Sequence, residues 1–128
     1  MQTGMANAKQ PGLEKMLEIW NSRDSLNKRE LAASCLEHNI HFVDPNHNLV
    51  GRDAFLAMVE KVQGQIPCAV YSRTSEVDKQ NNFCRYHWAI HLEGKLLMSG
   101  FDVTEVNDSG RIVKVIGFFG KLEDKATA

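Results

Sequence analysis

The chain has 128 residues, of which 43% are hydrophobic and 24% charged, and its formal net charge at pH 7 is −1. This length predicts one domain with a hydrophobic core of its own. The balanced charge excludes a strongly basic surface, so we expect no nucleic-acid partner. No apolar run approaches the roughly 20 residues of a membrane-spanning helix, and the first residues lack a signal pattern. We therefore expect a cytoplasmic protein without a membrane partner.

Three widely spaced cysteines, Cys35, Cys68 and Cys84, stand among apolar residues. Their odd number and the absence of a Cys-x-x-Cys motif indicate neither a disulfide framework nor a zinc site. We expect buried, reduced thiols.

The histidines do not have the spacing of a metal-ligand set, and the sequence predicts no metal and no cofactor. We interpret four of them as surface or interface residues: His41, His47, His87 and His91.

The first half of the chain predicts helices. Residues 1–11 are small and polar without a period, which is typical of a disordered tail. Apolar residues from Leu13 to Trp20 recur at helical spacing, and residues 21–24 end that helix. A second helix is expected from about Asn27.

A short strand over 40–44 follows a break at His38 and Asn39, and Pro45 ends it because proline donates no ladder hydrogen bond. Residues 46–48 have turn chemistry.

A third helix is expected from Gly51, with Phe55 and Met58 on its apolar face, and Gly64 and Pro67 end it.

The second half predicts strands joined by turns. The expected strands are 69–77, 83–92, 96–106 and 111–122. Helices followed by a meander of strands indicate an α+β fold, with N-terminal helices packed on one face of a curved antiparallel sheet. The prediction is a single domain over 12–122 with a C-terminal tail over 123–128.

Two aspartates stand alone in apolar strands. Asp102 lies within Gly100–Thr104, and Asp44 ends the run from Ile40. A carboxylate among residues that favour burial needs a hydrogen-bond partner, a proton or a chemical role. The pattern predicts a pocket that contains both acids. A structural role stays open for each, since aspartate before proline commonly caps a turn.

Alternation along the strands predicts which side chains share a face. Tyr86 and Trp88 are expected to face the helices. In the last strand, Gly117 and Phe119 share one face and Phe118 lies on the other. Both faces of that strand are apolar, so both need cover. The helices cover one face, and a monomer with a single sheet has nothing to cover the other. We therefore expect a homodimer packed through the outer sheet face.

Several of these residues occur together, in order, in one known family. They are Trp20, Asp44-Pro45, Gly51–Phe55, Trp88, Gly100–Asp102, Gly110–Ile112 and Gly117–Gly120. With them the chain resembles the nuclear transport factor 2-like superfamily, nearest to its SnoaL-like and ketosteroid isomerase branch. The resemblance implies a cone-shaped, cystatin-like α+β barrel with an internal cavity. It implies no single function, since this fold hosts isomerases, cyclases, dehydratases, epoxide hydrolases and binding domains.

The resemblance also implies catalytic roles. In ketosteroid isomerases the aspartate of an Asp-Pro pair is the general base, the role implied for Asp44. A protonated aspartate on a hairpin strand completes an oxyanion hole, the role implied for Asp102. Those enzymes add a tyrosine on the first helix. Trp20 stands in its place here, and its indole N–H donates a hydrogen bond without the acidity of a phenol.

Two functions follow as expectations. The first is an isomerase- or cyclase-like enzyme that moves a proton on a hydrophobic carbonyl compound of polyketide or steroid type. The second is a non-catalytic, dimeric ligand-binding module. In either case we expect five residues to bind the small molecule: Phe42, Met58, Tyr86, Trp88 and Phe119.

Overall fold

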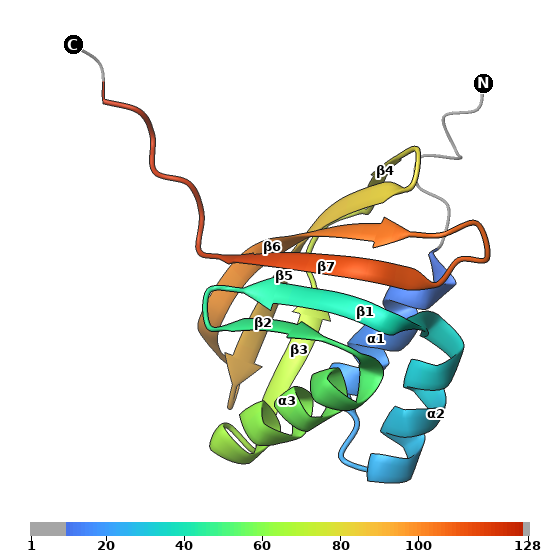
Figure 1. Ribbon diagram of the computed structural model, residues 1–128. Coiled ribbons are helices and arrows are strands. Elements are labelled where there is room, and N and C mark those ends of the chain that lie inside the picture. Colours follow the sequence, from blue (N-terminus) through green and yellow to red (C-terminus); the bar gives the residue numbers. More distant parts are fainter. Residues whose placement is uncertain (1–9, 127–128) are drawn as a thin grey trace.

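The computed structural model describes residues 10–126 (Figure 1). Its elements, in chain order, are α1 (Pro11–Asn21), α2 (Ser25–Cys35), β1 (Leu36–Asp44), β2 (His47–Val50), α3 (Arg52–Gln65), β3 (Ala69–Arg73), β4 (Asp78–Gln80), β5 (Phe83–Leu92), β6 (Lys95–Val106) and β7 (Ile112–Phe119). Residues 1–9 of the predicted N-terminal tail lie outside the described residues. The tail was predicted to extend to residue 11, but α1 begins at Pro11.

The strands form one curved, unclosed sheet in the order β2-β1-β7-β6-β5-β3, with β4 paired to β5. This confirms the predicted α+β class of three helices on one sheet, with one difference. β1 pairs in parallel with β7, while the other pairs are antiparallel, so the sheet is mixed. A parallel pair requires a long crossover, and the chain between β1 and β7 supplies it.

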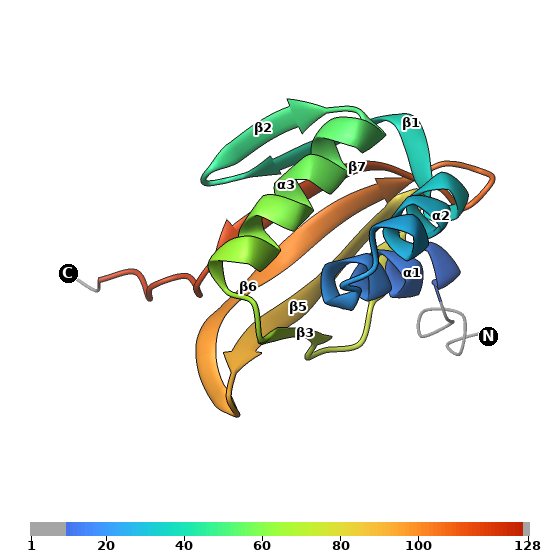
Figure 2. The same cartoon turned by 90° about the horizontal axis from the view of Figure 1, so that it is seen from below.

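The three helices lie on the concave side of the sheet (Figure 2). Their inward side chains and those of the sheet form one hydrophobic core. Its largest fully buried side chains include Phe55, Ile19, Leu36, Ile40 and Ile112. Among the described residues, no helix combines the length and apolarity that crossing a membrane would require.

The start of α2 differs from the prediction. We expected the helix from about Asn27, but it begins at Ser25. The side chain of Asp24 accepts hydrogen bonds from the backbone N–H groups of Leu26, at 3.0 Å, and Asn27, at 3.4 Å. This N-cap satisfies donors that the first helical turn leaves free, so the helix starts earlier.

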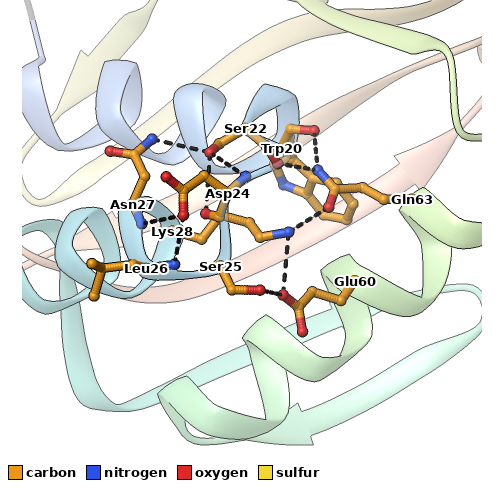
Figure 3. A network of polar contacts seen from close by, with 9 residues as sticks. All are labelled: Trp20, Ser22, Asp24, Ser25, Leu26, Asn27, Lys28, Glu60 and Gln63. Atoms are coloured by element: carbon orange, nitrogen blue, oxygen red, sulfur yellow. Dashed lines mark hydrogen bonds and ion pairs between the residues drawn. The ribbon is translucent and has the colours of Figure 1, made fainter.

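A buried polar network joins the three helices (Figure 3). The ammonium of Lys28 on α2 donates to Oε1 of Gln63 on α3 at 2.6 Å and lies 3.4 Å from Glu60. The amide of Gln63 in turn donates to the carbonyl oxygens of Trp20, at 2.9 Å, and Ser22, at 2.8 Å. One side chain therefore ties the end of α1 to both other helices.

Two short strands were not predicted. β2 covers residues assigned in part to a turn, and β4 lies where a turn was expected. In addition, β1 begins at Leu36 and includes the predicted break at His38 and Asn39. That break corresponds to an irregularity, since the pairing of β1 with β7 shifts register between Leu36 and His41. In each case pairing with a neighbouring strand imposes the extended conformation.

Other boundaries shift by a few residues. β3 ends at Arg73 rather than at residue 77, and α3 continues through Gly64 to Gln65. Two of the cysteines are buried free thiols, but Cys68 is exposed, so its predicted burial is wrong. It lies in the short connection after α3, where apolar neighbours in sequence do not imply a place in the core.

Candidate functional site

A cavity of about 410 Å³ lies among α1, α3 and the concave face of the sheet. This volume is within the range of small-molecule sites, well above that of a packing defect. The structure places all eight predicted site residues in its wall. They are Trp20, Asp44 and Asp102, for which catalytic roles were predicted, and Phe42, Met58, Tyr86, Trp88 and Phe119, for which substrate contacts were predicted.

Asp102 accepts hydrogen bonds from two side chains, one at each of its carboxyl oxygens. The hydroxyl of Tyr86 donates to its Oδ2 at 3.1 Å, and the indole N–H of Trp88 donates to its Oδ1 at 2.9 Å. Tyr86 lies directly opposite Asp102 in the β5–β6 ladder, so strand register brings these side chains together.

Burial raises the pKa of Asp102 from 3.8 to about 6. The hydrogen bonds from Tyr86 and Trp88 oppose this rise because they favour the charged form, and the nearby charge of Asp44 adds to it. At neutral pH roughly one molecule in ten then carries the proton. Burial, followed by the negative charge of Asp102, raises the pKa of Tyr86 well above its usual range, so its hydroxyl stays a donor.

The indole of Trp88 is fixed from two sides. A Cβ at Gly100 would collide with the indole ring and with the carbonyl oxygen of Phe118. The ring of Phe119 meets the indole edge to face, with centroids 5.8 Å apart. Glycine at position 100 therefore lets the indole lie against the strand, where its N–H reaches Asp102.

Asp44 ends β1 and forms a pair with His47, the first residue of β2. Its Oδ1 accepts from the backbone N–H of Asn46 at 2.8 Å and lies 2.9 Å from Nδ1 of His47. The side chain of Asp44 is 9% exposed and that of His47 is 27% exposed.

His47 lines the cavity, so its prediction as a surface or interface histidine is wrong. The reason is the hairpin that the sequence did not reveal, because residues 46–48 were assigned to a turn. As a turn residue, His47 would point to solvent. As the first residue of β2 it stands directly opposite Asp44 in the ladder. An Asp-Pro-x-His spacing between two strands was the available signal.

Gly117 on β7 brings the two acids into one space. It lies opposite Asp102 on β6, and its neighbour Ile116 pairs with Val43, next to Asp44 on β1. A Cβ at Gly117 would lie 3.1 Å from Oδ1 of Asp102 and 3.5 Å from Cβ of Asp44. Because position 117 has no side chain, the two acids lie on either side of the same small gap.

Trp20 belongs to an aromatic cluster in another part of the wall. Its ring stacks on Tyr71 with centroids 5.0 Å apart and meets Phe55 edge to face at 6.0 Å. The side chain of Asn21 fixes the backbone of Tyr71 through two hydrogen bonds of 2.8 and 2.9 Å. The indole that contacts Asp102 is that of Trp88, a partner that sequence reasoning treated as part of the apolar wall.

Tyr71 is a cavity residue that sequence reasoning missed. It shares the inward face of β3 with Ala69 and Arg73, and the ion pair of Arg73 with Glu14, at 3.0 Å, lies beside it. Alternation along the strand was the signal that could have found it. Within residues 10–126, no three His, Cys, Asp or Glu side chains gather as a metal site requires.

Comparison with solved structures confirms the predicted resemblance. A proposed isomerase of the SnoaL-like family from Agrobacterium tumefaciens is 28% identical in sequence and superposes with a TM-score of 0.81. The match covers 86% of this chain and 95% of the neighbour's chain. An NTF2-like protein of unknown function from an Exiguobacterium species is 18% identical, with 87% and 99% coverage and a TM-score of 0.70. A proposed polyketide cyclase from Sinorhizobium meliloti is 12% identical, with 83% and 92% coverage and a TM-score of 0.65.

At 18% and 12% identity, the last two comparisons show the fold alone. No family model matches the sequence. No curated protein matches it either.

Proposed function

We propose that the protein is an isomerase- or cyclase-like enzyme that transfers a proton on a hydrophobic carbonyl compound bound in the cavity. One observation supports this above the others: Asp102 and Asp44 lie on either side of Gly117 in a mostly apolar chamber, which His47, the partner of Asp44, also lines. Proton transfer needs an acceptor and a donor at one reacting centre, and carbanion chemistry needs a polar group where charge develops. The structural neighbour described as a proposed isomerase of the SnoaL-like family supports this class of reaction.

In this proposal the Asp44–His47 pair accepts a proton from a carbon next to the carbonyl group. The protonated form of Asp102 then donates a hydrogen bond to the oxygen on which negative charge develops. Its pKa of about 6 keeps this form accessible at neutral pH, because burial disfavours the carboxylate. Trp20, predicted as a further donor, contributes to the aromatic wall and is a candidate contact for the ring system of the ligand.

The cavity wall supports a flat, apolar ligand. Phe42, Met58 and Phe119 line the chamber together with Trp20 and Trp88. Aromatic and sulfur-containing side chains favour stacked ring systems through dispersion and edge contacts. The proposed substrate is therefore a fused-ring ketone of polyketide or steroid type.

Exchange of α-protons in D₂O, followed by ¹H NMR on fused-ring ketones, tests the proposal without knowledge of the final product. We expect the protein to accelerate exchange and Asp102→Leu, which removes the donor, to reduce the rate by about 10²-fold or more. Asp78→Leu is the control, because Asp78 is exposed and pairs with Arg85 at 2.8 Å away from the cavity. No exchange with any ketone, or full exchange by Asp102→Leu, would contradict the proposal.

A non-catalytic binding module is the second candidate, and one observation favours it. Tyr86 and Trp88 already donate to the two oxygens of Asp102, as in a structural carboxylate. In that case ketones would bind equally well to the original chain and to Asp102→Asn, with exchange by neither.

We propose, in addition, that the chain forms a homodimer through its outer sheet face. Phe118 on β7 is 47% exposed, and its ring stacks on Phe101 of β6 with centroids 4.9 Å apart. His87 of β5 meets the other edge of Phe101 at 6.2 Å. This aromatic row crosses three strands on the face opposite the helices, where a second copy would cover it. Sedimentation at two concentrations tests it, and a monomer at both would contradict it.

A further inference from the structure

We propose that His47 is a catalytic residue of this cavity and that Asp44 is its positioning residue. The inference rests on the proposed proton transfer and says which atom of the Asp44–His47 pair takes the proton. It moves the role of general base from Asp44, where the resemblance to ketosteroid isomerases puts it, to Nε2 of His47.

The hairpin holds the two side chains in a fixed relation. Asp44 and His47 are the last ladder pair of β1 and β2, and only Pro45 and Asn46 connect them. Proline restricts the first turn position, and the backbone N–H of Asn46 donates to Oδ1 of Asp44. The carboxyl group therefore has one orientation, set by the turn itself.

The same oxygen of Asp44 also contacts Nδ1 of His47 at 2.9 Å. A carboxylate only accepts hydrogen bonds, so Nδ1 carries the hydrogen and Nε2 of the neutral ring holds the lone pair. Within the part of the chain that the structure describes, Nε2 has no hydrogen-bond partner. An oriented imidazole with a free Nε2 is the arrangement that makes histidine a general base.

The surroundings of the pair direct the imidazole to the cavity. Phe42, itself buried, contacts the imidazole with ring centroids 6.5 Å apart. His47, Asp44 and Asp102 all line the chamber. His41 provides the contrast: it lies on the same strand as Asp44, but its Nε2 is bonded to Oδ1 of Asn48 at 2.8 Å and it does not line the cavity.

The proton step is balanced within the site. Nε2 of His47 removes a proton from the carbon next to the carbonyl group, and the C–H electron pair forms the enolate. The charge on the imidazolium is then stabilised by Asp44, and the enolate oxygen receives a hydrogen bond from protonated Asp102. The imidazolium returns the proton to the same carbon or, where a carbon–carbon double bond is conjugated with the enolate, to the far end of that system with a shift of the double bond. The carbonyl group re-forms and the ring is neutral again.

Chemical rescue separates this assignment from its alternative. In the D₂O exchange assay we expect His47→Ala to lose about 10²-fold or more in rate and added imidazole to restore part of it. His41→Ala, the matched control on β1 outside the cavity wall, should keep the original rate. If Asp44 is itself the base, His47→Ala stays active and Asp44→Asn alone abolishes exchange; that result overturns the inference and leaves the proposed function standing.

The role of Asp44 has a readout that needs no substrate. The ring ¹⁵N shifts of His47 should report hydrogen on Nδ1 in the original chain and a shift toward hydrogen on Nε2 in Asp44→Ala, which removes the acceptor oxygen. Unchanged ring shifts in Asp44→Ala would overturn the positioning role. Absence of exchange in the original chain together with the expected ring shifts would refute the proposed function, and with it the catalytic role of His47.

Discussion

Lys28 and Asp102 hold ionisable groups largely away from solvent at two places in the fold, and their surroundings differ. Lys28 lies between the helices, 3% exposed, with Gln63 and Glu60 as partners. Asp102 lies on the sheet with Tyr86 and Trp88 as partners, and beside it is a cavity of about 410 Å³. The partners of Lys28 are side chains of the neighbouring helix α3. Asp102, by contrast, lines the cavity on one side.

The comparison teaches how to recognise a candidate site. Burial of a charge is costly, and both groups meet that cost with hydrogen bonds. A buried charge surrounded on all sides stabilises helix packing and has no access to a ligand. A buried acid next to an apolar chamber, with a second acid across a glycine, can meet one. The adjoining cavity, more than burial, distinguishes the two regions.

The largest expected effect concerns the helix network. Gln63→Ala removes an acceptor from Lys28 and a donor from the carbonyl oxygens of Trp20 and Ser22. We expect the free energy of unfolding to fall by about 3 kcal/mol, because the buried ammonium of Lys28 and two part-buried carbonyl oxygens each lose a partner. Urea denaturation measures it, with Gln65→Ala, exposed on the same helix, as the control. A loss equal to that of the control would show that the network does not hold the helices.

A smaller effect is expected from the charge on Asp102. Its pKa rises from 3.8 in the unfolded chain to about 6 in the folded protein, so the folded state binds the proton more tightly. Stability should therefore increase as pH falls from 7 through 6, with the full gain below about 4. The part of the gain that falls between pH 7.5 and 4.5 is on the order of 2 kcal/mol.

Thermal unfolding of the original chain and of Asp102→Asn, compared between pH 7.5 and 4.5, measures this gain. The variant should lack this part of the pH dependence, because an amide does not titrate. Parallel curves for the two proteins would mean that Asp102 is solvated in the folded state, and the contrast with Lys28 would fail.

The smallest expected effect is on the pKa of Asp102, and it comes from the hydrogen bond that Trp88 donates to this residue. Trp88→Phe removes the indole N–H that favours the carboxylate, so the pKa of Asp102 should rise above about 6. A ¹³C NMR titration of the aspartate carboxyl groups follows this change. Trp20→Phe is the matched control, since the hydrogen bonds to Asp102 come from Tyr86 and Trp88. Equal shifts in both variants would assign the effect to the cavity wall as a whole.

Local patterns in the sequence predicted a large part of the fold. The helical spacing around Leu13 and Met16, the turns near 93–95 and 107–110, and the alternation in the long strands all appear in the structure. The short strands β2 and β4 escaped prediction because β4 is entirely polar and β2 begins with His47 and Asn48, which are typical of turns. Pairing with β1 and β5, and not their own preference, makes them extended.

The two acids of the candidate site could be predicted from the sequence, but their hydrogen-bond partners could not. Asp44 and Asp102 were visible because a carboxylate in an apolar strand is unusual. His47 was not, because its place in the cavity depends on the β1–β2 register. The same holds for the indole of Trp88, which reaches Asp102 only because Gly100 lets it lie against the strand.

By itself, the sequence determined the order and type of most elements, the isolation of two aspartates and the glycines beside them. Periodicity and residue chemistry are local, so they can be read along the chain. Only the tertiary structure decided that Asp44 and Asp102 meet across Gly117. That meeting depends on the parallel pairing of β1 with β7, a contact between residues far apart in the chain. Such pairings follow from how the helices cover the sheet, and no short sequence window contains that information.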